Sequence, residues 1–164
     1  APGTFENHVK KVEKIFWQER FPVYTEWKDR WLRNYQAKGY FDLLTGFRCQ
    51  GLFKRNQVIN YPVQGAAFHI VLYAVILMQN YIDKHKMKSK LVGQIHDSIV
   101  GDVPPEELQD YLTALRHIIT VTIPKRWPWL IIPLEVEAEV CPVGGPWVEK
   151  RVWVQGGAGT WAKK

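Results

Sequence analysis

Apolar residues recur at helical spacing through the first forty positions of the chain. Between Thr4 and Glu19 such a residue returns every three or four positions, at Phe5, Val9, Val12, Ile15 and Phe16. This period predicts a helix with one apolar face. Pro22 then opens a second helical stretch, since proline is tolerated in a first turn. Its apolar positions recur every fourth residue, at Val23, Trp27, Trp31 and Tyr35. Gly39 is placed to end this helix as a C-cap.

The next segments predict a small hairpin and then a long helix. Tyr40–Leu44 and Phe47–Gln50 flank the turn pair Thr45-Gly46. A helix is expected from about Lys54 to Lys84. Between Ala66 and Met78 it is apolar almost all round, which predicts a buried helix. Pro62 lies inside this stretch and is expected to start or kink the helix.

The second half of the chain alternates strand and helix signals. Leu91–Val100 places an adjacent His and Asp between two β-prone segments and predicts a second hairpin. A helix is expected to begin near Pro104, with acidic residues in its first turn. Leu134–Val140 alternates apolar and acidic residues, as a half-buried strand does. Gln155–Gly159 is flexible in composition.

Composition indicates a folded, basic protein. A chain of 164 residues, 46% of them hydrophobic, can form one domain with its own core. The formal charge of +6 favours a polyanionic partner such as nucleic acid. Cys49 and Cys141 are too few and too far apart for a disulfide framework or a zinc site, which favours a reducing compartment. The longest uninterrupted apolar run, Ile70–Met78, is too short to span a membrane.

Two groups of polar residues are candidates for chemistry. Asp97, next to His96 at a strand end, could present its carboxylate to a divalent metal, although one carboxylate alone binds Mg²⁺ poorly. Asn60 and Gln64 are four residues apart and would share a helical face. Their amides suit the acceptors that every base pair presents in the minor groove. On spacing alone, the same amides could instead cap a kink at Pro62.

These segments, taken in order, resemble the C-terminal half of a family A DNA polymerase, the bacterial DNA polymerase I type. The run Asn60-x-Pro62-x-Gln64-Gly65-x-Ala67 is followed by Gln94-Ile95-His96-Asp97, which is similar to motif C of that family. Further matches are Ala37-Lys38-Gly39-Tyr40 leading to Thr45-Gly46-Phe47-Arg48, and Leu134–Glu137 ending at Gly145-Pro146-Trp147. The resemblance covers about Ile15 to Glu149, and the short Gly46–Asn60 connection is similar to phage-encoded members.

The resemblance implies an α+β protein, a partial polymerase palm whose small antiparallel sheet carries the motif C hairpin packed on long helices. Asp97 would be one of two aspartates that hold two Mg²⁺ ions, which clamp the attacking 3′-oxygen and the leaving pyrophosphate. His96 would position the primer terminus, and Asn60 and Gln64 would contact the primer–template. Phosphates would be held, without reading sequence, by Arg48, Lys54 and Arg55.

The chain also departs from the family pattern. Ser98 stands where the family has Glu, which removes a carboxylate from the metal site. A hydroxyl can still hold a metal-bound water there. Motif A, whose Asp is the second metal ligand, has no counterpart in this sequence, and neither do the fingers, thumb and exonuclease regions.

We therefore expect the C-terminal palm subunit of a split, phage-encoded DNA-directed DNA polymerase. Another polypeptide would supply motif A, fingers and thumb and would share the Mg²⁺ site. The substrates would be primer–template DNA and dNTP, in the cytoplasm of the bacterial host and without a membrane. The expected parts are a helical pair and hairpin (1–53), the palm portion with motif C (54–149) and a flexible C-terminal extension (150–164).

Two further hypotheses remain open at this point. The chain could be a catalytically silent palm remnant that acts as a DNA-binding or scaffold module in a replication complex, which Ser98 in place of Glu supports. It could also be a processed or engineered fragment of one longer polymerase.

Overall fold

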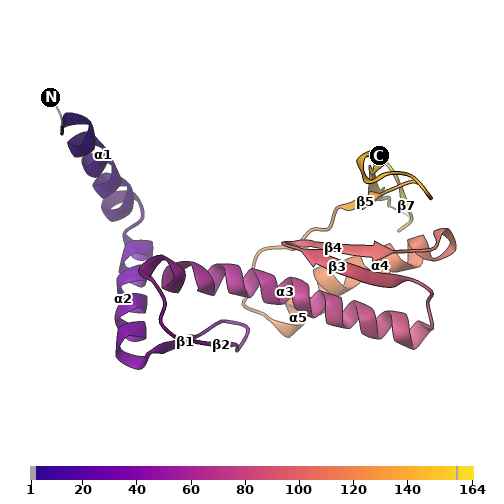
Figure 1. Cartoon of the computed structure of the whole chain (residues 1–164), viewed down its shortest axis with the longest axis horizontal. Coiled ribbons are helices and arrows are strands. Elements are labelled where there is room, and N and C mark those ends of the chain that lie inside the picture. Colours follow the sequence, from indigo (N-terminus) through magenta and orange to yellow (C-terminus); the bar gives the residue numbers. More distant parts are fainter. Residues whose placement is uncertain (1–2, 158) are drawn as a thin grey trace. The chain divides into compact units, whose positions relative to one another are not determined.

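The computed structural model describes residues 3–157 and 159–164 (Figure 1). The chain divides into two compact units, Ala1–Ala66 and Ala67–Lys164, which are described separately below. The long helix α3 (Arg55–His85) contributes its first turns to the first unit and the remainder to the second. The three-part functional division at residues 53/54 and 149/150 stays a prediction.

The first unit contains the expected helices and the expected hairpin. Helix α1 (Thr4–Lys14) continues into the π-helical turn η1 (Ile15–Arg20), and α2 follows at Pro22–Lys38. Gly39 ends α2 with φ of 75°, a left-handed conformation that glycine adopts without strain. Strand β1 (Tyr40–Asp42) pairs antiparallel with β2 (Arg48–Gln50).

The core of the first unit is small and largely aromatic. Phe41, Leu43 and Val58 are buried, and Trp31 and Tyr35 of α2 pack against them. The Tyr35 hydroxyl donates to the Gly51 carbonyl at 2.6 Å and accepts from the Phe53 backbone N–H at 2.8 Å. One tyrosine thus fixes the connection between β2 and α3.

Helix α3 spans nearly the stretch predicted from Lys54 to Lys84, with Pro62 inside it; of the two expectations for Pro62, that it starts the helix is wrong. The helix begins seven residues earlier, at Arg55, and continues through the proline. Proline has no N–H to donate to the carbonyl four residues before it, which here belongs to Val58. The Trp31 indole N–H donates to that carbonyl at 2.9 Å. The acceptor that Pro62 leaves free is therefore satisfied by a side chain of α2.

Replacing Trp31 by Phe should reveal this bond. Trp31→Phe leaves the Val58 carbonyl without its donor, and we expect a loss of about 1–3 kcal/mol in the free energy of unfolding. In a Pro62→Ala background the backbone N–H of residue 62 can replace the indole, so the same substitution should cost less. A double-mutant cycle in urea measures the difference. Equal costs of Trp31→Phe in the two backgrounds would contradict the assignment.

The second unit combines a hairpin, a helical segment and a small sheet. Strand β3 (Lys90–Ile95) pairs antiparallel with β4 (Ser98–Asp102). The helical segment runs through η2 (Pro105–Glu107), α4 (Leu108–His117), η3 (Ile118–Thr122) and α5 (Ile123–Arg126). The last sheet has the order β5-β6-β7 and is formed by Ala138–Val140, Arg151–Gln155 and Trp161–Lys163, with the 3₁₀ turn η4 (Trp147–Glu149) before β6.

The β3–β4 hairpin lies along α4 and the later turns of α3 (Figure 1). Leu91 and Ile99 of the hairpin pack against a core that includes Met78 of α3 and Leu115 of α4. This arrangement confirms the expected combination of helices with small antiparallel sheets, and it supports the hairpin along most of its length.

Helix α3 is less buried than its composition predicts. Ala74 and Met78 are fully buried, but Phe68, Leu72 and Ile76, spaced four residues apart, are exposed. Among the described residues, α3 is also the helix that is long and apolar enough to cross a membrane, by length and composition alone. Core helices of soluble proteins pass the same test. The prediction of a buried helix is therefore correct for one face only.

The C-terminal predictions need correction. Only Ala138–Val140 of the expected strand Leu134–Val140 forms a ladder, because β6 offers it partners only from Arg151 to Trp153. The segment 150–164, expected to be a flexible extension, contains two strands, β6 at Arg151–Gln155 and β7 at Trp161–Lys163. Trp161 anchors them, since only 3% of its surface is exposed.

Gly101 provides a test of the packing between β4 and α4. A Cβ at this position would collide with the Tyr111 hydroxyl and lie 2.9 Å from Tyr111 Cζ. We expect Gly101→Ala to lower the free energy of unfolding by about 1–3 kcal/mol. Tyr111→Phe should recover part of that loss because it removes the colliding oxygen. Gly93→Ala is the matched control, because nothing lies within 4 Å of its added Cβ; an equal loss there would contradict the explanation.

Candidate functional site

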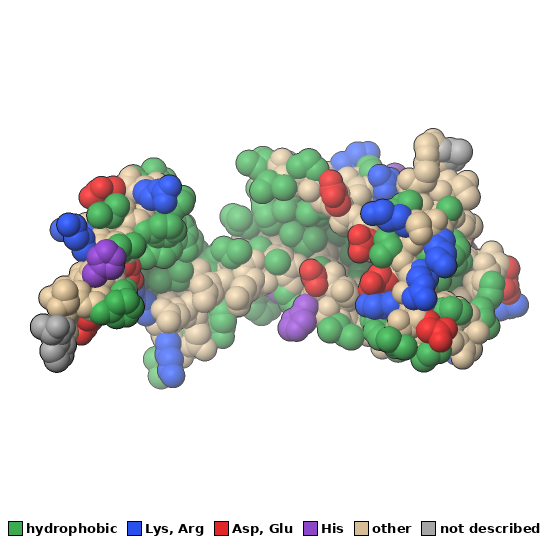
Figure 2. All heavy atoms as spheres, turned by 90° about the horizontal axis from the view of Figure 1, so that it is seen from above, with side chains coloured by type: hydrophobic (Ala, Val, Ile, Leu, Met, Phe, Trp, Pro, Cys, Tyr) green, Lys and Arg blue, Asp and Glu red, His purple; other side chains and the backbone are tan. Residues whose placement is uncertain are grey.

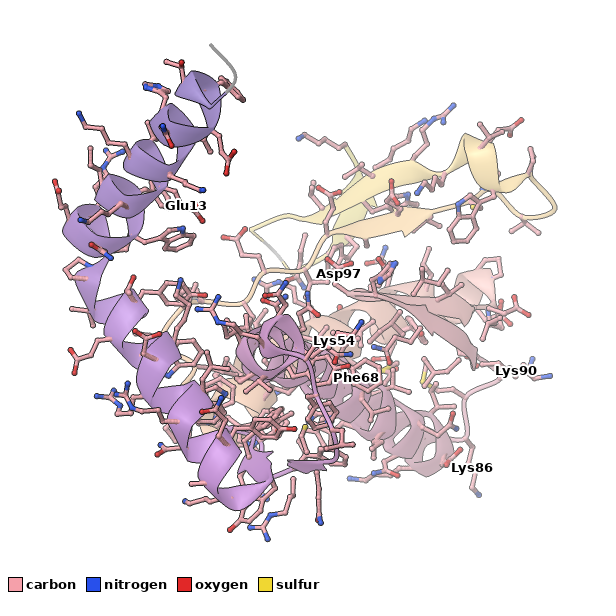
Figure 3. All side chains as sticks on the ribbon, turned by 60° about the vertical axis from the view of Figure 1, so that its left-hand side comes forward. Glu13, Lys54, Phe68, Lys86, Lys90 and Asp97 are labelled. Atoms are coloured by element: carbon pink, nitrogen blue, oxygen red, sulfur yellow. The ribbon has the colours of Figure 1, made fainter. Side chains whose placement is uncertain are left out.

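The His96-Asp97 pair forms the tip of the β3–β4 hairpin. Ile95 pairs with Ser98, so His96 and Asp97 are the two turn residues and Ser98 begins β4. Side chains of all three residues at the turn, His96, Asp97 and Ser98, are exposed. Figure 3 shows Asp97 at this end of the hairpin and Lys90 at the other. The hairpin therefore presents a carboxylate to solvent at its tip.

The backbone at the tip is strained. His96 has φ of 53°, while Asp97 is not among the residues with positive φ. A positive φ at the first turn position alone is the type II′ pattern, in which glycine is usual. A side chain in the left-handed region costs roughly 1–2 kcal/mol. The Gln94 side-chain amide donates to the His96 carbonyl at 3.1 Å and so braces the turn.

The base of the hairpin is held by Glu107, a residue that the sequence analysis treated only as a first-turn acid. Its carboxylate accepts from the backbone N–H groups of Lys88 and Ser89, each at 2.8 Å, and from the Ser89 hydroxyl at 2.5 Å. The bonds from the Lys88 backbone and the Ser89 hydroxyl hold the pKa of Glu107 below its ordinary value. Because these partners lie 18 or 19 residues away, no local pattern indicates them.

The metal donors of this chain do not form a magnesium site by themselves. Asp97 supplies one carboxylate and Ser98 a neighbouring hydroxyl. Over residues 3–157 and 159–164, no group of three or more His, Cys, Asp or Glu side chains is placed to hold a metal ion. Mg²⁺ requires octahedral oxygen ligation, usually with one or two carboxylates plus waters and substrate phosphates. Asp97 and Ser98 could therefore supply part of the ligand set of such a site.

Strands β3 and β4 form a two-stranded sheet, and neither pairs with a third strand among the described residues. On β3, Val92 is 67% exposed and Ile95 is 58% exposed. Open edges with apolar side chains are associating surfaces unless another element covers them. A two-stranded sheet is also marginal without further strands or packing. The edges of the hairpin are therefore candidates for pairing with a further strand.

Asn60 and Gln64 lie in the first unit, on α3. The helix is continuous through both residues, so they share one face, and both are exposed. Neither amide caps the proline, since Trp31 satisfies the Val58 carbonyl. Gly65, next to this pair, is approached by the Leu43 side chain rather than by another backbone, and an added Cβ would lie 2.7 Å from a Leu43 methyl.

The three basic candidates of the first unit differ in their availability. Arg48 binds Asp42 through two hydrogen bonds of 2.7 and 3.0 Å, and its guanidinium lies 4.0 Å from the centre of the Tyr40 ring. The bond from Arg48 lowers the pKa of Asp42. Lys54 and Arg55 are exposed at the start of α3. The Arg48 guanidinium is therefore already paired with the Asp42 carboxylate, whereas Lys54 and Arg55 have exposed side chains that can bind a phosphate.

The candidate residues fall into two groups, one in each unit. The first unit holds Arg48, Lys54, Arg55, Asn60 and Gln64, and the second holds His96, Asp97 and Ser98.

Glu107→Gln tests the brace at the base of the hairpin. A carboxylate with a lowered pKa stabilises the fold fully above its ordinary value of 4.5, and loses that effect as the pH falls through the lower folded-state value. We expect Glu107→Gln to be less stable than the wild type at pH 7, with the difference shrinking below pH 4.5. Denaturant unfolding at several pH values measures it. Glu106→Gln is the control, because Glu106 forms an exposed ion pair with Lys88 at 3.8 Å; an equal loss of stability there would exclude a specific brace.

Sequence comparison identifies relatives over most of the chain. Residues 9–148 match the family model described as DNA polymerase family A. DNA polymerase I of Lactococcus lactis subsp. cremoris is 28% identical over 152 residues, which cover 85% of this chain and 16% of that protein. A DNA polymerase of Bacillus phage SP01 is 30% identical over 63 residues, covering 38% of this chain and 7% of that protein.

A solved structure shares the fold. The POL domain of Pol1 from M. smegmatis, in complex with DNA primer-template and dNTP, aligns with a TM-score of 0.58 and 20% identity, over 67% of this chain and 21% of that one. The chain thus spans less than a quarter of the length of each of these three proteins. Because the family match extends from residue 9 to residue 148, the chain belongs to DNA polymerase family A.

Proposed function

We propose that this chain supplies the C-terminal palm part of a DNA-directed DNA polymerase active site. The observation that carries the proposal is the His96-Asp97 turn: an exposed carboxylate at the tip of an open-edged hairpin, in a chain of family A. Asp97 would be a ligand of catalytic Mg²⁺. A pair of such ions stabilises the attacking and leaving oxygens in phosphoryl transfer.

The neighbours of Asp97 have supporting roles in this proposal. His96 would position the primer terminus, because the turn presents its imidazole beside the carboxylate. Ser98 would hold a metal-bound water in place of the carboxylate that family members have at that position. The strained φ of His96 supports a functional constraint, since such conformations persist where the surroundings impose them.

The first unit would contact the primer–template. Asn60 and Gln64 present two exposed amides on one face of α3, as minor-groove contacts require. Lys54 and Arg55 would bind phosphates, which fixes position without reading sequence. Arg48 would do the same only by exchanging its Asp42 partner for a phosphate, so we assign it the weakest contribution.

The site would be completed by another polypeptide that carries motif A, fingers and thumb. Three observations support this: the small donor set of the described residues, the open edges of the hairpin, and the exposed apolar residues on α3 and β3. A strand from the partner would pair beside the hairpin and bring the second aspartate. The similarity to the phage SP01 enzyme agrees with a phage origin and with action in the bacterial cytoplasm.

A second candidate function is a catalytically silent DNA-binding or scaffold module. Ser98 at the position of a family carboxylate is the observation that favours it. Such a module would keep the first-unit contacts with DNA and would not need Asp97. The two functions therefore differ in what they require of one side chain.

Substitutions at Asp97 and Ser98 separate the two functions. In primer extension with the chain and a polypeptide that supplies motif A, fingers and thumb, encoded by the neighbouring reading frame, we expect Asp97→Ala to lower the rate by about 100-fold or more. Ser98→Glu should raise the rate or leave it unchanged, because it restores a carboxylate beside the metal.

Asp102→Ala is the matched control, because it removes an exposed carboxylate from the opposite end of the same hairpin. It should retain wild-type activity. Synthesis by the isolated chain, or an equal rate with Asp97→Ala in the complex, would refute the proposed function.

A further inference from the structure

The last sixteen residues lie beyond the family match, which ends at residue 148. They are nevertheless ordered over their described part, as strands β6 and β7 of the C-terminal sheet. β6 pairs with β5, which lies within the family match, so the addition continues a sheet that the family part begins.

Two contacts fix this addition to the second unit. The Gln109 side chain on α4 donates to the Trp161 carbonyl at 2.7 Å and accepts from the Trp161 N–H at 2.8 Å. Lys150 forms an ion pair of 2.5 Å with Glu139 on β5. Trp161 and Trp153 also join the hydrophobic core of the second unit. The β6–β7 hairpin is therefore packed against the second unit.

The register of the hairpin brings its cations to one end. Trp153 pairs with Lys163, and the Lys164 N–H donates to the Val152 carbonyl at 2.9 Å. Lys164 therefore faces Val152. Arg151, the first residue of β6, lies one position beyond Val152, and Lys150 lies one position further, so all four cations are at the same end of the hairpin. We call this end the basic end; it consists of Lys150, Arg151, Lys163 and Lys164.

The charge of this segment is large for its length. Residues 149–164 contain four Lys or Arg and one Glu, a net charge of +3 out of +6 for the chain. Lys150 is neutralised by Glu139, whereas Lys163 and Lys164 are exposed. Figure 2, a view from above, shows Lys and Arg side chains on the surface of the second unit, interspersed with Asp and Glu.

We propose that the basic end of the β6–β7 hairpin binds the phosphate backbone of duplex DNA. The cations of the basic end would attract the regularly spaced phosphates of a duplex. Because phosphates are the same in every sequence, this contact would add affinity without sequence preference. The choice of DNA as the polyanion rests on the proposed function. The contact itself needs neither Asp97 nor nucleotidyl transfer.

The salt dependence of DNA binding tests this proposal. Binding of the chain to a fluorescent duplex, without dNTP or metal, is measured over a range of salt concentrations. Each phosphate contact contributes about 0.9 to the slope of log K against log salt, so Lys163→Ala/Lys164→Ala should reduce its magnitude by about 1.8. Lys163→Arg/Lys164→Arg should retain the slope, because the contact is electrostatic.

Lys11→Ala/Lys14→Ala on α1 is the matched control, since it removes the same charge from exposed positions of the first unit. It should leave the slope unchanged. An equal reduction in this control, or no reduction in Lys163→Ala/Lys164→Ala with an unchanged melting temperature, would overturn the proposal. Two other results for Lys163→Ala/Lys164→Ala would also overturn it. In one, the variant loses binding to vesicles of phosphatidylcholine and phosphatidylserine but keeps its binding to DNA. In the other, the wild type dimerises through the β7 edge and the substitutions leave DNA binding unchanged.

Asp97→Ala separates this inference from the proposed function. The variant should lose polymerisation in the complex and keep the wild-type salt slope. A slope that changes with Asp97→Ala and not with the two lysines would place the DNA contact elsewhere.

Discussion

The first unit depends on one hydrogen bond between a side chain and a helix backbone. The Trp31 indole takes the place of the N–H that Pro62 lacks, and so allows α3 to begin at Arg55 rather than at the proline. The two helical turns that this adds carry Asn60 and join α3 to the aromatic cluster around Phe41. Without the indole, the Val58 carbonyl would lose its donor beside the stretch where the amides Asn60 and Gln64 share a face. The packing of α2 on α3 and the candidate DNA surface therefore have a common origin.

In the second unit, contacts at both ends of the β3–β4 hairpin position the exposed His96-Asp97 turn. The tip of the β3–β4 hairpin has an unfavourable φ at His96, and the Gln94 amide bonds to that residue's carbonyl. At the other end, the Glu107 carboxylate binds the two backbone N–H groups just before β3. The strands between these points pack on α3 and α4 through Leu91 and Ile99. An exposed Asp97 can thus be held in place without being buried.

Local patterns predicted the elements that local interactions determine. Both N-terminal helices, the Gly39 cap and the two hairpins follow from residue spacing and from turn residues. The bond from the Trp31 indole to the Val58 carbonyl and the brace at Glu107 could not be predicted in this way, because each depends on a partner that only the fold brings near. Strand β7 shows the same limit, because it is held by Trp161 and by Gln109, which is 52 residues away. Asp97, Asn60 and Gln64 were candidates from residue type and spacing, their expected roles came from the resemblance to a family, and their geometry came from the structure.

We propose that Asp97 is a metal ligand in a site that another polypeptide completes. Mn²⁺, a paramagnetic substitute for Mg²⁺, tests it directly through the broadening of NMR signals from the β3–β4 turn. The account predicts weak binding to the isolated chain and tight binding to the reconstituted complex, which Asp97→Ala abolishes and Asp102→Ala does not. Tight binding by the isolated chain, or binding by the complex that does not require Asp97, would contradict it.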